Sequence, residues 1–145
     1  MKISTKGRYG LRTLMDIAMH QNQGAVTLND IAKRQRISVK YLWQVINPLK
    51  TAGFVNVTRG SKGGYMLARR PEEIDLLQIV TTLEGDVSLV DCLHKNTTCD
   101  LSNSCVARMV WMEVNQAVEQ ALNKITLADV LKRCEGVGSI NNYVI

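Results

Sequence analysis

The sequence predicts a mainly helical protein with one small β-hairpin. Over residues 7–21 and 38–52, apolar side chains recur every three or four positions, as they do on a helix that buries one face. Between residues 54 and 68, two short and mostly apolar runs flank a glycine-rich connection. Over residues 104–123, a further apolar stripe predicts a helix of about 20 residues, which would span roughly 30 Å.

Charge divides the chain at Pro71. Residues 1–70 hold 13 Lys and Arg against 2 Asp and Glu, whereas residues 71–145 hold 5 against 11. Because Lys and Arg bind nucleic acid by neutralising its phosphates, we expect the basic half to meet double-stranded DNA. An unevenly charged surface without such a partner is the alternative explanation.

The chain holds no uninterrupted apolar run of about 18 residues, and no apolar stretch follows Met1. We therefore expect a cytoplasmic protein without a membrane partner. In that reducing compartment, four cysteines are expected to be thiols or metal ligands rather than disulfides.

The basic half is expected to begin with two helices. The first runs from Gly7 to about Gln21, with Ser4 and Thr5 available as caps. The second runs to Gln35 from a capping box at Thr27, which has Asp30 where Glu or Gln is usual.

A third helix is expected from the cap at Ser38 to Gly53. Its buried face would carry Leu42, Val45, Ile46 and Leu49, and its outer face Lys40, Trp43, Gln44 and Asn47. Two short helices joined by a tight turn, of which the second exposes hydrogen-bonding side chains, describe a helix-turn-helix that could enter a major groove.

A hairpin is expected to follow, with strands over 54–58 and 65–68. Its connection, residues 59–64, combines glycines with Arg59 and Lys62. A narrow minor groove attracts such cations, and glycine lets the backbone approach closely. A plain flexible turn would explain the glycines but not the cations, so residues 1–70 are expected to form a winged helix-turn-helix DNA-binding domain.

The acidic half is expected to contain a connecting helix within residues 71–85, a cysteine loop at 86–104, a long helix at 105–124, and a short helix with an irregular tail at 125–145. The short helix would begin at Thr126 and end near Cys134, before a tail from Glu135 to Ile145.

The long helix is expected to mediate dimerisation. Its apolar stripe consists of Val106, Met109, Val110, Val114, Ala117, Val118, Ala121 and Leu122. A second copy of the same helix would cover this stripe most readily, so we expect a homodimer. Packing against its own winged domain is the alternative.

Three of the four cysteines, Cys92, Cys99 and Cys105, lie within 14 residues. This spacing lacks the paired knuckles of a zinc ribbon, and an iron-sulfur cluster, which usually needs four ligands, accepts looser spacings. A cluster, zinc, and redox-active or plain buried thiols all remain open. Cys134 stands apart and is expected to be structural.

His94 is the first choice for a fourth ligand because it is the only imidazole near the cysteines. Asp91, Asp100, Glu113 and a donor from the other subunit are alternatives. No nucleophile has an adjacent base in the sequence, so we expect no enzyme, although a redox nucleophile among the loop cysteines is a competing hypothesis.

Several segments resemble the IscR-type iron-sulfur cluster regulators and their winged-helix relatives. They are the cysteine loop, Ser4-Thr5-Lys6-Gly7-Arg8-Tyr9, Ile37-Ser38-Val39-Lys40-Tyr41-Leu42-Trp43-Gln44, Ala52-Gly53-Phe54-Val55 and Arg59-Gly60-Ser61-Lys62-Gly63-Gly64-Tyr65. The resemblance covers nearly the whole chain in order.

The resemblance implies a dimeric bacterial transcription regulator, expected to repress iron-sulfur cluster biogenesis genes. It would hold a 2Fe-2S cluster on Cys92, Cys99 and Cys105, so that residues 86–104 become the cluster-binding loop, and cluster occupancy would change its DNA binding. Cluster assembly proteins are further candidate partners. The residues expected to contact DNA are Lys6, Arg8, Ser38, Lys40, Trp43, Gln44, Arg59, Ser61 and Lys62.

Two departures from the IscR pattern concern these sites. Arg108 stands where the pattern has a histidine ligand, and a guanidinium cation should not bind iron. Trp43 stands where the pattern has a glutamate that helps to set specificity. Gln44 and Arg59 match the base-reading positions, and a glutamine pairs well with adenine.

Other relatives suggest alternative functions. NsrR-type nitric-oxide sensors also carry three cysteines and lack the histidine, but they take a carboxylate ligand near the N-terminus, where this chain has Arg8. CymR-type cysteine-metabolism regulators lack the three cysteines and fit less well. A zinc-stabilised DNA-binding protein without a sensing role is a further alternative.

Overall fold

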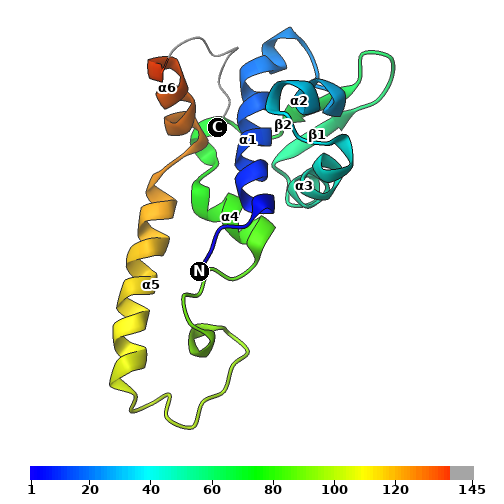
Figure 1. Cartoon of the computed structure of the whole chain (residues 1–145). Coiled ribbons are helices and arrows are strands. Elements are labelled where there is room, and N and C mark those ends of the chain that lie inside the picture. The colour runs from blue at the N-terminus through cyan, green and yellow to red at the C-terminus, as the bar shows by residue number, and fades with distance from the viewer. Residues whose placement is uncertain (138–145) are drawn as a thin grey trace.

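The structure is a computed structural model that describes residues 1–137 (Figure 1). The helices are α1 (Thr5–His20), α2 (Leu28–Gln35), α3 (Val39–Thr51), α4 (Leu76–Glu84), α5 (Val106–Lys124) and α6 (Leu127–Val137). Short 3-10 turns are η1 (Gln21–Gln23), η2 (Pro71–Glu73) and η3 (Asp91–Leu93), and the strands are β1 (Val55–Thr58) and β2 (Gly64–Leu67). The predicted fold class, mainly helical with one small β-hairpin, is confirmed.

Side-chain caps define where most helices begin. Ser4, Thr27, Ser38 and Asp75 each accept a hydrogen bond from a backbone N–H in the first turn of α1, α2, α3 and α4. Helix α1 therefore begins two residues before the expected Gly7. These local interactions explain why the expected helix starts lie close to the observed ones.

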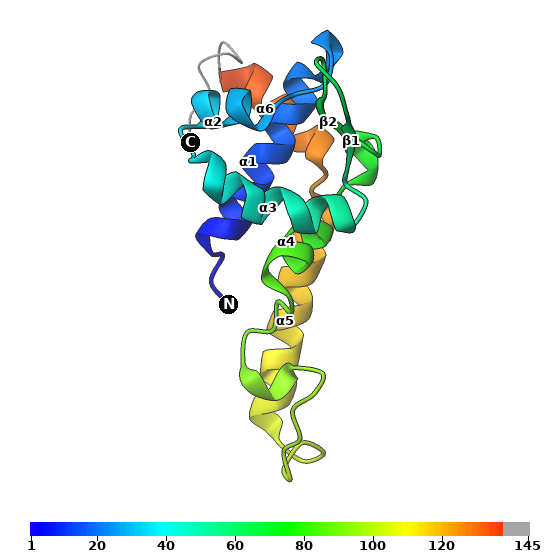
Figure 2. The ribbon, with the colours of Figure 1, turned by 90° about the vertical axis from the view of Figure 1, so that its right-hand side faces the viewer.

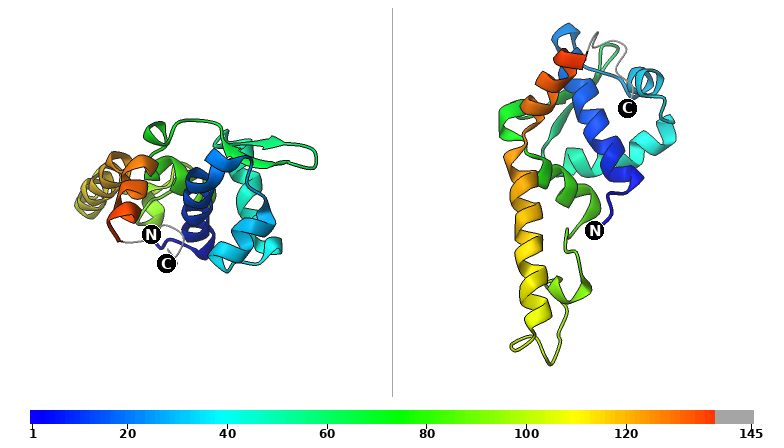
Figure 3. Two further views of the ribbon diagram at one scale, coloured as in Figure 1. Left: turned by 90° about the horizontal axis from the view of Figure 1, so that it is seen from above. Right: turned by 60° about the vertical axis from the view of Figure 1, so that its left-hand side comes forward.

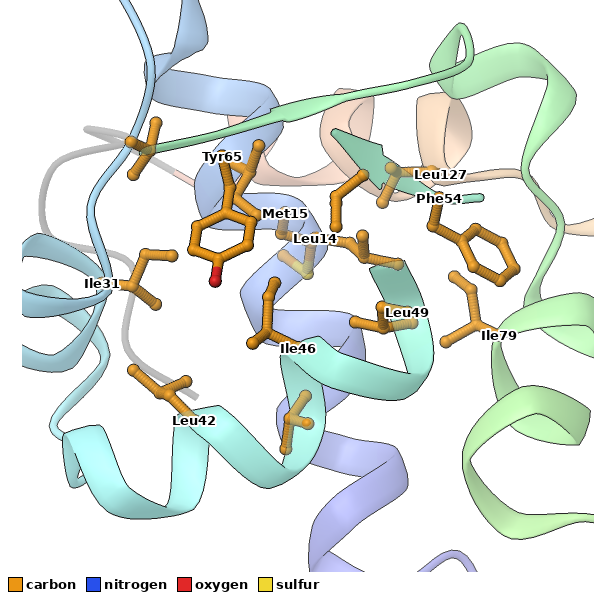
Figure 4. Close-up of a cluster of buried hydrophobic side chains, with 14 of the residues drawn as sticks. Leu14, Met15, Ile31, Leu42, Ile46, Leu49, Phe54, Tyr65, Ile79 and Leu127 are labelled. Atoms are coloured by element: carbon orange, nitrogen blue, oxygen red, sulfur yellow. The ribbon is translucent and has the colours of Figure 1, made fainter. Parts of the chain in front are cut away.

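One hydrophobic core joins the helix-turn-helix to α1 and α4 (Figure 4). Leu14 and Ile17 of α1 meet Leu42, Ile46 and other fully buried side chains of α3. Phe54, 2% exposed, packs beside Ile79 of α4 at the edge of this cluster. The four apolar residues predicted for the inner face of α3 are each 0% exposed, so that prediction is confirmed.

Backbone hydrogen bonds fix the register of the hairpin and attach it to the rest of the domain. Its antiparallel register pairs Val55 with Leu67 and Thr58 with Gly64. Tyr65 and Val26 exchange two backbone hydrogen bonds, of 2.9 and 2.7 Å, which attach β2 to the segment before α2. Gly64 adopts φ +156° there, and a Cβ at this position would overlap the backbone of Val26.

Helix α5 contacts α4 and extends well beyond the helix-turn-helix (Figures 1 and 2). Seen from above, the hairpin and α5 lie at opposite ends, with α1 between them (Figure 3). Beyond α5, the Leu127 N–H donates a hydrogen bond to the Ile74 carbonyl, and α6 packs against α1 and η2. The cysteine loop lies at the far end of α5 from this junction.

Two expectations need correction or lie beyond the structure. Helix α6 continues to Val137, so the expected irregular tail is wrong for residues 135–137. Residues 138–145 of that tail lie outside the described part of the chain. Within residues 1–137, no helix has the length and apolar character needed to cross a membrane.

Candidate nucleic-acid interface and cysteine loop

Helix α3 presents a polar face to solvent. Lys40, Trp43, Gln44 and Asn47 are exposed, and Trp43 has half of its side-chain surface accessible. Because the opposite face of α3 is fully buried, these exposed side chains project from a rigid support. In Figure 2, α3 crosses the front of the molecule, with the hairpin on its right and the start of α1 on its left.

A polar network fixes α2 against α1. Asp16, 0% exposed, accepts hydrogen bonds from Arg34 at 2.6 Å and from the Gln35 side chain at 2.9 Å. Arg12 donates in turn to Gln35. The hydrogen bond to Asp16 raises the pKa of Arg34 above its ordinary value. Sequence reasoning missed this network, although an aspartate among the apolar residues of α1 was its one visible signal.

The tip of the hairpin carries the predicted cations. Arg59, Ser61 and Lys62 are exposed, and the tip closes through a hydrogen bond of 3.0 Å from the Gly63 N–H to the Gly60 carbonyl. Between this tip, α2 and α3 lies a hollow of about 350 Å³. It is lined by Thr27, Leu28, Asn29, Val39, Trp43, Gly63, Gly64 and Tyr65.

The first turn of α1 carries two further predicted DNA contacts. Arg8 is exposed and Lys6 is partly exposed. The backbone of this turn is capped by Ser4 and also by Glu84, whose Oε1 accepts the Gly7 N–H at 3.0 Å. Sequence reasoning missed Glu84, because a contact between residues 77 positions apart leaves no local pattern.

The cysteine loop has local structure and few anchors. Cys92 and Cys105 are half-buried, whereas Cys99 is exposed. Two side chains of α5 hold its first part: Asn115 accepts the Leu89 N–H at 2.9 Å, and Arg108 donates to the Cys92 carbonyl at 3.5 Å. The backbone hydrogen bonds that begin at Thr97, Ser102 and Ser104 all end on residues of the loop itself.

The three cysteines are not gathered into one site. Over residues 1–137, no group of three His, Cys, Asp or Glu side chains is placed to hold a metal ion. Cys105 caps α5, and its sulfur accepts the Arg108 N–H at 3.4 Å.

His94, the first choice for a fourth ligand, is engaged by carboxylates. Its Nδ1 lies 2.8 Å from Asp86, and its Nε2 lies 3.6 Å from Asp91. The hydrogen bond from the Ser88 hydroxyl, followed by those from His94 and the Ser88 N–H, holds the pKa of Asp86 below its ordinary value. The alternative ligands Asp91, Asp100 and Glu113 are exposed.

Most of the apolar stripe on α5 is exposed. Val106, Met109 and Val110 are 71%, 66% and 51% exposed, and Val114, Ala117 and Ala121 are exposed as well. Val118 and Leu122 are partly buried. The alternative expectation, that the stripe packs against the winged domain of the same chain, is therefore wrong for most of its residues.

Comparisons with known proteins identify relatives along almost the whole chain. A family described as "Rrf2: Iron-dependent Transcriptional regulator" matches residues 3–133. "Protein rrf2" of Nitratidesulfovibrio vulgaris is 42% identical over 132 residues, which cover 91% of this chain and 88% of that protein. The solved structure of T. potens IscR shares 38% identity and a TM-score of 0.76, and covers 96% of this chain and 92% of its own. The structure of CymR, the global cysteine regulator of B. subtilis, shares 34% identity and a TM-score of 0.76, with coverages of 92% and 98%.

Proposed function

The chain belongs to the Rrf2 family of transcriptional regulators, and we propose that it is an IscR-type member. It binds operator DNA as a homodimer, and a 2Fe-2S cluster on Cys92, Cys99 and Cys105 modulates its DNA affinity. The observation that carries the proposal is the exposed polar face of α3 beside the exposed cations of the hairpin.

DNA recognition divides between the helix and the hairpin. Helix α3 enters the major groove, where Gln44 reads a base edge, with adenine its best partner. The hairpin reaches the minor groove, where Arg59 and Lys62 meet its negative potential. Lys6, Arg8, Ser38, Lys40 and Ser61 contact phosphates and set the position of α3 on the duplex. Trp43 adds an apolar and hydrogen-donating side chain to the surface that reads bases.

Dimerisation covers α5. The exposed valines Val106, Val110 and Val114 lie on the same side of the helix as Ala117 and Ala121. Small side chains allow two helices to approach closely, and a two-fold axis would bring the same face of each copy together. Two DNA-reading heads related by this axis would match two half-sites.

The cysteine loop has the donors that a cluster needs. Three thiols supply soft ligands for iron, and the N–H of Arg108 already points to the Cys105 sulfur. Cys92, Cys99 and Cys105 would hold the cluster after the loop closes, which its mostly local hydrogen bonds allow. His94 would have to release a carboxylate before it could act as the fourth ligand. When bound, the cluster supplies a redox-sensitive and labile cross-link of the loop.

A second candidate is nitric-oxide sensing by an NsrR-type protein. Arg108 favours it, because the guanidinium stands in the place of the IscR histidine ligand and bonds to the loop backbone. Such a regulator would use the same DNA-binding domain, the same dimer interface and the same cysteines, but its cluster would react with nitric oxide.

The proposal is tested by anaerobic purification followed by metal and sulfide analysis. We expect iron and acid-labile sulfide in equal amounts, with visible absorption that is lost in Cys92→Ala. Stoichiometric zinc without sulfide would support a zinc-stabilised DNA-binding protein instead. Exposure of the loaded protein to nitric oxide then separates the two sensing candidates by the change in operator binding.

A further inference from the structure

Glu84, the last residue of α4, is bonded to the start of α1. Its Oε1 accepts the Ser4 N–H at 2.9 Å, the Ser4 hydroxyl at 2.7 Å and the Gly7 N–H at 3.0 Å. A Cβ at Gly7 would overlap this oxygen, so the approach requires glycine there. A carboxylate at this position also complements the positive end of the helix dipole.

The turn that Glu84 caps carries Lys6 and Arg8, both proposed to contact phosphates. Two acceptors share the N–H groups of this turn. The Ser4 hydroxyl accepts the Lys6 N–H at 3.1 Å, and the Glu84 carboxylate accepts the Gly7 N–H. Farther along, α1 and α4 touch through Gly10 and Leu83, where a Cβ at Gly10 would overlap the leucine side chain. That apolar contact does not depend on Glu84. Loss of the Glu84 bonds would therefore loosen the first turn without separating the two helices.

On its other side, Glu84 lies two residues before the start of the cysteine loop. Gly85 follows with φ +83°, a conformation that L side chains rarely adopt. Asp86 comes next, accepts the Ser88 N–H at 3.1 Å and pairs with His94 at 2.8 Å. A rearrangement of the loop that moves His94 would also displace Asp86, which only one glycine separates from Glu84.

We propose that Glu84 is the positioning residue through which the cysteine loop controls the DNA contacts of α1. The two states are Glu84 bonded to Ser4 and Gly7, with Lys6 and Arg8 held in place, and Glu84 withdrawn, with the first turn loosened. The inference rests on the proposed function, since it needs a loop that changes state and an α1 that binds DNA. The Glu84 cap of α1 would then be the two-state element that a coupling between the cysteine loop and the DNA-binding surface requires.

The test measures how cluster loading changes operator affinity in wild type and Glu84→Ala. For wild type, the dissociation constants of the loaded and cluster-free forms for operator DNA should have a ratio that differs from 1 by about 5- to 150-fold, the usual range for coupled sites. For Glu84→Ala, the ratio should fall towards 1 while the visible spectrum of the cluster is unchanged. Amide hydrogen exchange of residues 4–9 should respond to loading in wild type and should not respond in Glu84→Ala.

Glu72→Ala is the matched control, because it removes the same charge from an exposed residue of η2 and should keep the wild-type ratio. Should Glu84→Ala not fold, Gly7→Ala decides, because a Cβ at Gly7 would overlap the Glu84 oxygen and displace it: a ratio closer to 1 than that of wild type supports the inference. A wild-type ratio in the folded Glu84→Ala or Gly7→Ala protein overturns the inference and leaves the proposed function intact. A ratio of 1 in wild type itself overturns both the inference and the cluster-sensing role.

Discussion

At the scale of single residues, we propose that Gln44 and Arg59 read the DNA sequence. Both side chains are exposed, one on α3 and the other at the hairpin tip. Replacing either by alanine should cost about 1 to 3 kcal/mol of binding to the selected operator, because Gln44 loses a base edge and Arg59 loses its contact with the narrow minor groove. Binding to random DNA should change much less.

Titration of labelled duplexes by fluorescence anisotropy checks this prediction. Gln23→Ala, which truncates an exposed glutamine on η1, is the matched control and should bind as wild type does. An equal loss of affinity for operator and random DNA would show that Gln44 and Arg59 do not read sequence.

The cysteines should differ in reactivity. Cys99 is exposed, whereas Cys134 is 2% exposed and its burial raises the pKa of its thiol. Because the thiolate is the nucleophile, cluster-free protein treated with iodoacetamide near neutral pH should be alkylated first at Cys99 and last at Cys134. Peptide mass spectrometry over time gives the order, and rapid labelling of Cys134 in folded protein would contradict its place in the core.

The raised pKa of the Cys134 thiol also makes the stability of the fold depend on pH. A thiol whose pKa is higher in the folded protein holds its proton more tightly there than in the unfolded chain. Stability is therefore unaffected below the unfolded pKa and decreases as the pH rises above it. Replacement by serine would remove this alkaline dependence.

At the scale of elements, the helix-turn-helix depends on the Asp16 network. Asp16→Asn removes the charge that pairs with Arg34 and should lower the free energy of unfolding by about 2 kcal/mol. The estimate lies below the roughly 3–5 kcal/mol typical of a fully buried pair, because the Arg34 side chain is 32% exposed and water screens it. Urea denaturation measures the change, with Glu72→Ala as the control, and equal stability of both variants would show that the network does not hold α2.

The elements also show which features a sequence can predict. The inner face of α3 and the caps Ser4, Thr27 and Ser38 were predictable, because their signals lie within a few residues of one another. The hairpin was predictable to within one residue at each strand end. The end of α6 was not, because glycine at 136 indicates a helix end, whereas the helix continues one residue beyond it.

Features that join distant residues could not be predicted. Asn115 accepts the Leu89 N–H, and Glu84 caps α1, yet neither side chain has a distinctive neighbourhood in the sequence. The candidate metal site was predictable only as a set of donors. The structure does not bring those donors together within residues 1–137, so the ligand set stays a prediction.

At the scale of the whole molecule, α5 is predicted to form the interface between two copies. Val110→Glu places a charge in the middle of the exposed apolar stripe and should convert the dimer to monomer, because an unpaired charge is costly to bury. Operator affinity should fall in parallel, because two linked DNA-binding domains bind two half-sites more tightly than a single domain binds one.

Sedimentation velocity at several protein concentrations reports the oligomeric state. Asn123→Glu, an equally acidic change at an exposed position near the end of α5, is the control and should remain dimeric. A wild-type protein that is monomeric at all concentrations, or a Val110→Glu variant that stays dimeric, would contradict the role of α5.

The central claim is that a cluster on the cysteine loop sets DNA affinity, and operator binding by the loaded and cluster-free forms of one preparation tests it most directly. We predict dissociation constants that differ by about 5- to 150-fold. We also predict that Cys92→Ala binds as the cluster-free form does under both conditions. Equal affinity of the loaded and cluster-free wild-type protein for the operator would contradict the claim.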